Sequence, residues 1–218
     1  MTRIGLFGGS FDPIHNGHLA VASAAMAQAD LAEILFIPTR ISPLKQELPP
    51  APDLDRWTMI VLATLELPQY RAARWEMDRE GPSYTVDTLR IARRELGDTA
   101  ELNWIIGADN LLTLPRWRDV AGILEQASFL VVPRADLHGD ALRAVWEAMP
   151  LDYRARIRIL DMEPVTVSST QIRACLAAGK PIDTLVPRLT MAYIERYNLF
   201  RSAGLFVSKK TGPPAEGL

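Results

Sequence analysis

The sequence contains a single cysteine, Cys175, and no apolar run long enough to cross a membrane. One thiol cannot form an internal disulfide or a cysteine-based zinc site, so neither is expected. A membrane helix needs about 20 consecutive apolar residues, and the first residues lack the apolar core and cleavage site of a signal peptide. We therefore expect a protein of the cytoplasm, a reducing compartment, with no membrane partner.

The sequence also lacks an excess of charge of either sign. It has 24 Lys and Arg against 26 Asp and Glu among 218 residues, a formal net charge of −2. No basic stripe with interleaved aromatic residues is present, so we expect no nucleic-acid partner. The hydrophobic content of 48% is ordinary for a globular protein, and the length suits one buried core. The sequence leaves open whether the chain forms a homo-oligomer.

Short β-branched or aromatic runs alternate along the chain with longer stretches of helical period. The short runs cover residues 4–7, 34–37, 72–75, 104–106, 129–132 and 157–160, and the helical stretches include residues 19–28, 54–67, 86–96 and 187–197. This alternation predicts an α/β fold, doubly wound, with a mostly parallel sheet and helices on both faces. In such folds ligands bind at the carboxyl ends of the strands, near the point where the strand order reverses.

Two segments have the composition of loops. Residues 38–53 include five prolines, too many for a strand, and predict a loop that covers a ligand, with a simple connector as the alternative. Residues 201–218 have little to bury and predict a flexible tail. We expect residues 1–200 to form a single domain, with a C-terminal helical part from about residue 168.

The first chemical motif directly follows the first predicted strand and reads Gly-Gly-Ser-Phe-Asp-Pro-Ile-His-Asn-Gly-His over residues 8–18. Glycines at a strand end let the backbone approach an anionic ligand. His15 and His18 are three residues apart, which places them on one face of the first helical turn. This turn also presents free N–H groups that favour phosphate. A metal site, with His138 as the remaining imidazole, and two core histidines are the alternatives, and a Gly-x-Gly-x-x-Gly dinucleotide fingerprint is absent.

A second motif lies near the other end of the chain, where Val-Ser-Ser-Thr-Gln-Ile-Arg occupies residues 167–173. Ser168, Ser169 and Thr170 suit the start of a helix that ends near residues 178–179, and a helix cap is their structural interpretation. Arg173 is expected in the first turn of this helix, where the helix dipole disfavours a cation. A bound anion would account for an arginine at that place.

The two motifs resemble those of the HxGH nucleotidyltransferases, Gly-Gly-Thr-Phe-Asp-Pro-x-His-x-Gly-His and Ile-Ser-Ser-Thr-x-x-Arg. The middle of the chain is similar to the bacterial nicotinate-nucleotide adenylyltransferases, through Pro-Ser-Tyr-Thr-Val-Asp-Thr-Leu at 82–89, Ile-Gly-Ala-Asp at 106–109 and Leu-Pro-Arg-Trp at 114–117. The resemblance covers residues 4–200. One segment departs from the family pattern: Thr39 and Leu44 replace the usual asparagine and histidine, while Lys45 is kept.

The resemblance implies a Rossmann-like nucleotidyltransferase that transfers the adenylyl group of ATP to nicotinate mononucleotide, a reaction of NAD biosynthesis. Its cofactor is Mg²⁺ that arrives with ATP, without a resident metal. The implied catalytic residues are His15, His18 and Arg173. The implied ATP-binding residues are Gly8, Gly9, Ser10, Phe11, His15, Gly17, His18, Gly107, Asp109, Ser168, Ser169, Thr170 and Arg173. The implied nicotinate-mononucleotide-binding residues are Ser10, Lys45, Ser83, Tyr84, Thr85 and Trp117.

Structural interpretations remain open for two of these residues. Asp109 could cap the turn over residues 110–114, and Trp117 could be a core residue. Two rival functions also remain. One is a sister enzyme that adenylylates nicotinamide mononucleotide or phosphopantetheine, and the other is a regulatory nucleotide-binding module without turnover.

Overall fold

The computed structural model describes residues 1–43 and 51–201 of the chain. Lys45 and residues 202–218 of the expected tail lie outside the described residues. Within them, six strands form one parallel sheet in the order β3-β2-β1-β4-β5-β6. The strands are β1 (Arg3–Gly9), β2 (Glu33–Pro38), β3 (Tyr70–Ala72), β4 (Glu101–Gly107), β5 (Ala127–Val132) and β6 (Ile157–Ile159). The order reverses between β1 and β4, so their carboxyl ends flank the expected ligand crevice.

The third predicted strand is misplaced. The sequence indicates a strand over residues 72–75, whereas β3 covers Tyr70–Ala72 and pairs only with β2. As an edge strand, β3 is bonded on one side, and the N–H of Ala73 makes the last bond to β2, 2.9 Å from the carbonyl oxygen of Phe36. Trp75 lies beyond this point and packs half-buried against the core. The aromatic and alanine residues that predict a strand here therefore belong partly to a loop.

Side chains alternate between two buried clusters, one on each face of the sheet. Along β2, Ile34 and Phe36 join one cluster, while Leu35 and Ile37 join the other. Successive side chains of a strand point to opposite faces, so a strand buried on both sides reads as a continuous apolar run. The prediction of a doubly wound sheet is confirmed.

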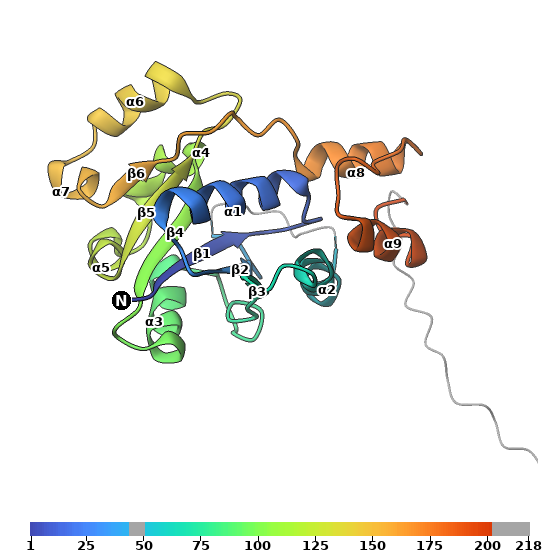
Figure 1. Ribbon diagram of the computed structural model, residues 1–218, viewed down its shortest axis with the longest axis horizontal. Coiled ribbons are helices and arrows are strands. Elements are labelled where there is room, and N and C mark those ends of the chain that lie inside the picture. Colours follow the sequence, from blue (N-terminus) through green and yellow to red (C-terminus); the bar gives the residue numbers. More distant parts are fainter. Residues whose placement is uncertain (44–50, 202–218) are drawn as a thin grey trace, which may run out of the picture.

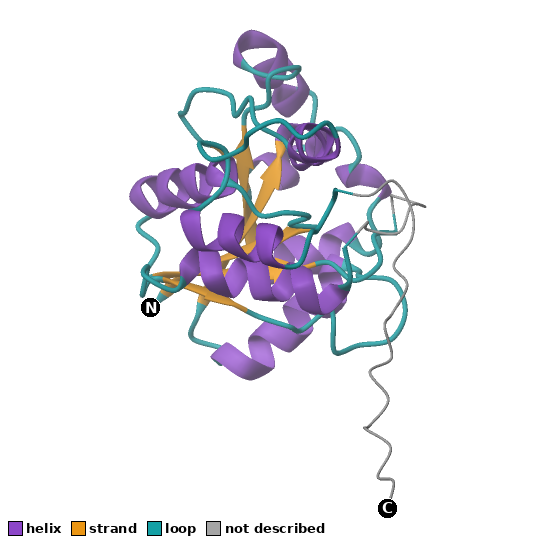
Figure 2. Ribbon diagram, turned by 90° about the vertical axis from the view of Figure 1, so that its right-hand side faces the viewer, coloured by secondary structure: helices purple, strands orange, loops and turns teal. Residues whose placement is uncertain are grey.

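Helices cover both faces of this sheet (Figures 1 and 2). Residues of α1 (Asn16–Ala29), α2 (Asp53–Thr64), α8 (Ser169–Ala177) and α9 (Arg188–Arg196) are buried in the cluster around Phe36. Residues of α3 (Thr85–Leu96), α4 (Ala108–Leu111), α5 (Val120–Gln126) and α6 (Gly139–Glu147) are buried in the cluster around Leu35. The short helices η1 (Leu114–Arg116) and α7 (Leu151–Arg154) complete the described chain.

The C-terminal helices lie beside the start of α1, where α8 and α9 appear in orange and red (Figure 1). The backbone N–H of Asn16 donates to the carbonyl oxygen of Leu185 over 2.9 Å, and its side chain donates to that of Thr184 over 2.9 Å. These bonds fix the beginning of α1 to the segment between α8 and α9. Among the described residues, no helix is long and apolar enough to span a membrane.

Candidate active site

The two histidines of the first motif stack on each other at the beginning of α1. Their ring centroids are 3.7 Å apart with an interplanar angle of 25°. His15 is the N-cap of α1, and its backbone N–H donates to Nδ1 of His18 over 3.2 Å. Because Nδ1 of His18 accepts this bond, the neutral ring carries its hydrogen on Nε2. His18 is therefore fixed as a donor through Nε2.

Both imidazoles are neutral at pH 7. Burial lowers the pKa of His15 from 6.5 to about 4, and the positive charge of Arg134 acts in the same direction. Burial also holds the pKa of His18 well below 6.5, reinforced by His15 and Arg134. A positive charge on His15 would repel one on the stacked ring of His18, which further disfavours protonation of His18.

Glycines of the first motif allow close approach of other segments. A Cβ atom on Gly8 would lie 2.8 Å from the Trp104 ring, on the neighbouring strand β4. A Cβ atom on Gly17 would lie 2.5 Å from Val165 and 2.7 Å from Val167, which lead into the second motif. These distances are too short for real contacts, so the motif requires glycine at both positions.

The second motif is bonded directly to the first. The hydroxyl of Ser169 donates to the carbonyl oxygen of Pro13 over 2.9 Å, and Nη1 of Arg173 donates to that of Asp12 over 2.7 Å. Ser168 is the N-cap of α8 and accepts from the backbone N–H of Gln171 over 3.2 Å, so its structural interpretation is confirmed. Arg173 is the fifth residue of α8 and thus lies just beyond the first turn, in which the sequence analysis placed it.

Asp12 is a buried carboxyl between two arginines. It is 1% exposed, and its Oδ2 lies 3.9 Å from Nη1 of Arg173. Burial raises the pKa of Asp12 to about 6, while Arg173, Arg56 and the backbone of Ala51 act in the opposite direction. The sequence analysis did not single out Asp12, although it lies inside the motif.

Phe11 supports the histidine pair from within the core. Its side chain is 1% exposed, and its ring centroid lies 4.9 Å from that of His18 in an edge contact. Its φ of 46° is in the left-handed region that residues other than glycine seldom adopt. A contact between Phe11 and ATP would therefore involve the backbone of this strained turn rather than the ring.

At the carboxyl end of β4, Asp109 turns back over Gly107. A Cβ atom on Gly107 would lie 2.4 Å from Oδ1 of Asp109, and Arg134 is 3.5 Å from the same oxygen. The N-cap of α4 is Gly107, and Asp109 lies inside that helix, so the capping interpretation of Asp109 is wrong. Sequence reasoning missed Arg134, although its position two residues after β5 is typical of a ligand-binding residue in this architecture.

Ser83, Tyr84 and Thr85 lie together at the beginning of α3. The backbone N–H of Ser83 donates to the carbonyl oxygen of Ile41 over 2.9 Å, and its hydroxyl accepts from the N–H of Arg40 over 3.2 Å. Tyr84 is the N-cap and Thr85 the first helical residue. The free N–H groups of this first turn are donors for an anionic ligand.

A buried carboxyl that sequence reasoning missed lies below this turn. Glu76 is 3% exposed and accepts from Oγ1 of Thr88 over 2.7 Å. Burial raises the pKa of Glu76, against hydrogen bonds from Thr88, Ser83 and Thr39. Glu76 therefore connects the first turns of α3 to the loop after β2.

Trp117 is half-buried just after η1. Its Nε1 donates to Oγ1 of Thr113 over 3.3 Å, and its ring makes an edge contact with Phe129 at 6.0 Å. One part of the ring therefore packs on the core, as expected if Trp117 were a core residue. The rest of the ring remains exposed. Tyr84 packs against the same buried cluster, so the structure brings these two predicted site residues to one side of the sheet.

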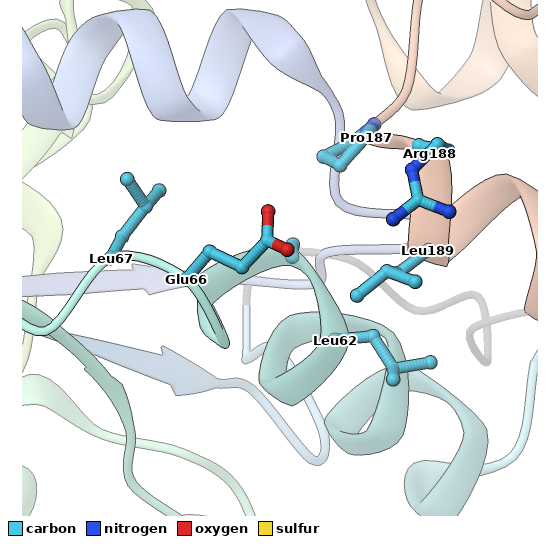
Figure 3. A pocket seen from close by; sticks show the side chains of 7 residues that line it. Leu62, Glu66, Leu67, Pro187, Arg188 and Leu189 are labelled. Carbon is cyan, nitrogen blue, oxygen red and sulfur yellow. The ribbon is translucent and has the colours of Figure 1, made fainter.

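No group of three acidic, histidine or cysteine side chains among the described residues could hold a metal ion. The donor set does not suit a resident Mg²⁺, because Asp12 is buried beside arginines and Asp109 is paired with Arg134. A hollow between α2 and α9 contains none of the predicted site residues (Figure 3); its lining consists of Leu62, Ala63, Glu66, Leu67, Pro187, Arg188 and Leu189. We assign this hollow to the packing of the two helices.

The family comparisons define the class of this protein as a nucleotide-transferring enzyme. The family model described as cytidylyltransferase-like matches residues 6–175. The chain is 37% identical over 199 residues to a Moorella thermoacetica protein named "Probable nicotinate-nucleotide adenylyltransferase", covering 91% of this chain and 92% of the relative. A Clavibacter michiganensis protein of the same name is 39% identical over 202 residues, covering 92% and 94%.

A solved structure has the same fold. It is the Plasmodium falciparum nicotinic acid mononucleotide adenylyltransferase complexed with NaAD, with a TM-score of 0.74 and 21% identity over 92% of this chain and 98% of that one. The chain thus belongs to the nicotinate-nucleotide adenylyltransferase family, within the cytidylyltransferase-like proteins.

Proposed function

We propose that this protein transfers the adenylyl group of ATP to nicotinate mononucleotide, which yields nicotinate adenine dinucleotide and pyrophosphate. The observation that carries the proposal is the neutral, stacked pair of His15 and His18 at the beginning of α1, the helix that follows β1. It is supported by relatives whose names state this activity and that match nearly the whole chain.

In the proposed reaction an oxygen of the mononucleotide phosphate forms a bond to the α-phosphorus of ATP. The bond between this phosphorus and the oxygen that bridges to the β-phosphorus breaks, and pyrophosphate leaves with that electron pair. No side chain forms a covalent bond, so the protein contributes positioning and stabilisation of charge. His18 donates through Nε2 to an α-phosphate oxygen, and the positive end of the α1 dipole adds to this field.

Arg173 neutralises the leaving pyrophosphate in this proposal. Its Nη1 is held by the carbonyl oxygen of Asp12, and its side chain is 26% exposed, which leaves the guanidinium accessible to an anion. Ser168, Ser169 and Thr170 bring further donors to the same side of the first motif. Mg²⁺ enters as part of the ATP complex and adds positive charge at the phosphates.

The acceptor is held by the first turn of α3 and by Trp117. The free N–H groups of the first turn of α3, including that of Thr85, donate to the nicotinate carboxylate, and the exposed part of the Trp117 ring stacks on the pyridine. Gly107 and Asp109 hold a ribose through its hydroxyls. Residues 1–200 act as one domain in this proposal, because α8 and α9 share a buried cluster with β1 and β2.

The test is pyrophosphate release from ATP with Mg²⁺ and one acceptor at a time. Nicotinate mononucleotide, nicotinamide mononucleotide, phosphopantetheine and no acceptor form the panel. We expect the highest kcat/KM with nicotinate mononucleotide and none without acceptor. If phosphopantetheine were the one acceptor that supports pyrophosphate release, it would take the place of nicotinate mononucleotide as the assigned acceptor. No release with any acceptor would favour a regulatory nucleotide-binding module.

A further inference from the structure

Arg56 of α2 is a fully buried arginine, with 0% of its surface exposed. Its Nη1 donates to the carbonyl oxygen of Ser10 over 2.8 Å and to that of Thr39 over 2.7 Å. Its Nη2 donates to Oδ1 of Asp53 over 2.5 Å. Burial of a guanidinium costs free energy that its hydrogen bonds offset, and these bonds from Nη1 and Nη2 hold the three acceptors in one geometry.

The two carbonyl groups come from loops with different proposed tasks. Ser10 belongs to the loop after β1 that is proposed to bind ATP. Thr39 belongs to the loop after β2, and its N–H also donates to the carbonyl oxygen of Gly9 over 2.8 Å. The next residues of that loop, Arg40 and Ile41, exchange two hydrogen bonds with Ser83.

A continuous path of bonds therefore runs from the ATP side to the acceptor side. It begins at Ser10, passes through the guanidinium of Arg56 to Thr39, and reaches Ser83 through the backbone of Arg40 and Ile41. Arg56 is the point at which both loops meet a single side chain. A planar guanidinium presents its donors in a fixed fork, which a flexible ammonium group does not.

We propose that Arg56 is a positioning residue that sets the distance between bound ATP and bound mononucleotide by clamping the two loops together. This inference rests on the proposed function, since it assigns ATP to the first loop and the acceptor to the loop joined to Ser83. Arg56 contacts neither substrate. In-line transfer requires the attacking oxygen and the α-phosphorus to be aligned, and a displacement of about 1 Å can slow such a step about 100-fold.

The test compares Arg56→Met and Arg56→Lys with matched changes at Arg93. Arg93 of α3 also donates to two backbone carbonyl groups, those of Ala100 and Gln126, which precede β4 and β5. This arginine thus makes the same kind of contacts at the opposite, amino ends of the strands. Its variants control for the loss of a part-buried, carbonyl-binding guanidinium without a change at the site.

We expect Arg56→Met to lower kcat at least about 30-fold, because the substrates are no longer aligned. The Kd of ATP alone and of nicotinate mononucleotide alone should stay within about threefold, because each loop keeps its own donors. Arg56→Lys should recover part of kcat, since an ammonium can still reach one carbonyl. Arg93→Met should lower the Tm and leave kcat within about twofold.

The proposal is overturned if Arg56→Met lowers the Tm while kcat stays within about twofold, or if Arg93→Met reduces kcat as much. It is also overturned if the entire effect is a weaker Kd for one substrate, which would make Arg56 part of one binding site. Should Arg56→Met fail to fold, Arg56→Lys decides alone: a fall in kcat of at least about threefold with unchanged Kd values supports the clamp, and an unchanged kcat rejects it.

Amide hydrogen exchange provides a readout that needs no turnover. Thr39, Arg40 and Ser83 have N–H groups in the bonded path, and their exchange should accelerate at least about tenfold in Arg56→Lys but not in Arg93→Lys. If the parent protein releases no pyrophosphate with nicotinate mononucleotide, the proposed function fails while the exchange data still show whether Arg56 joins the loops. Unchanged exchange at all three amides would reject the clamp.

Discussion

Nδ1 of His18 accepts a hydrogen bond from the backbone N–H of His15 over 3.2 Å, which leaves the hydrogen of the neutral ring on Nε2. The helix start therefore decides which nitrogen of His18 is the donor. A ring of this kind can donate to a phosphate oxygen without first gaining a proton, which suits its lowered pKa. The first prediction follows from this tautomer.

His18→Ala should lower kcat about 10²–10⁴-fold, the range for loss of one preorganised donor. The Tm should fall only modestly, because the side chain is half-buried and its loss removes one hydrogen bond, that from the N–H of His15. Pyrophosphate release and thermal unfolding measure the two quantities. His138→Ala, which alters an exposed imidazole, should keep kcat within about twofold; an equal kcat for His18→Ala and the parent would remove His18 from the mechanism.

His15→Gln should make stability less sensitive to acid. The folded protein takes a proton on His15 only at about pH 4, whereas the unfolded chain does so near 6.5, so the unfolded state binds more protons in between. The contribution of His15 to the free energy of unfolding is complete above pH 6.5. It falls as the pH drops towards 4, by about 2 kcal/mol between pH 7 and 5.

Urea unfolding at pH 7 and pH 5 measures this effect. The parent should lose more free energy of unfolding than His15→Gln over that interval. Asp12, with its pKa raised to about 6, acts with the opposite sign, but it is present in both proteins and cancels in the comparison. The same pH dependence in both proteins would contradict the lowered pKa of His15.

Arg173→Ala should raise the KM of ATP and weaken inhibition by pyrophosphate, while the KM of the mononucleotide changes less. The reason is that its proposed partner is the leaving group. Arg173 also donates to the carbonyl oxygen of Asp12, so a modest loss of Tm accompanies the change. If a lower Tm were the sole effect, the bond to Asp12 would be its whole role.

Trp117→Ala should raise the KM of the mononucleotide more than that of ATP. Loss of one stacking contact is worth about 1–3 kcal/mol, by analogy with base stacking. Trp146→Ala is the matched control, because Trp146 is also half-buried and donates to a backbone carbonyl, that of Ile157. The control should reduce the Tm without a change in either KM. Equal effects of Trp117→Ala on both KM values, with a large loss of Tm, would make Trp117 a core residue.

Nicotinate mononucleotide should be preferred over its amide by at least about tenfold in kcat/KM. A carboxylate accepts from two N–H groups of the first turn of α3, whereas the NH₂ of the amide would face a donor, at a cost of about 1–3 kcal/mol. Thr85→Ala should reduce this preference only in part, because the donors are backbone groups. Equal kcat/KM values for the two mononucleotides would refute the assignment of the acid while leaving adenylyl transfer intact.

The spacing of apolar and capping residues along the sequence was sufficient to predict most of the helices and strands. The spacing of Val86, Leu89 and Ala92 predicts α3, since an apolar stripe of helical period is a local property. The beginning of α8 was predicted equally well from Ser168, whose side chain caps the helix it precedes. The bounds of β3 were misjudged because an edge strand begins and ends where it pairs with its single neighbour β2, which no local pattern encodes.

Sequence reasoning could propose site residues where they form contiguous motifs. His15, His18 and Arg173 were assigned to the candidate site because the motifs that contain them are short and specific. Arg56 could not be found in this way, because an arginine in an amphipathic helix ordinarily faces solvent. Its partners, the carbonyl groups of Ser10 and Thr39, are brought to it only by the tertiary fold. Arg134 is a similar case, since its charge acts on histidines more than 100 residues away in the sequence.

The contact of Gly17 with Val165 and Val167 has a consequence for the growing polypeptide. The first motif leaves the ribosome early, but the segment with Val165 and Val167 that contacts Gly17 is synthesised about 150 residues later. A nascent chain without α8 lacks the bonds from Ser169 and Arg173 to the loop after β1. The proposed ATP site is thus complete only after α8 has been synthesised, and ATP bound there would stabilise chains that contain α8 over chains that lack it, by mass action.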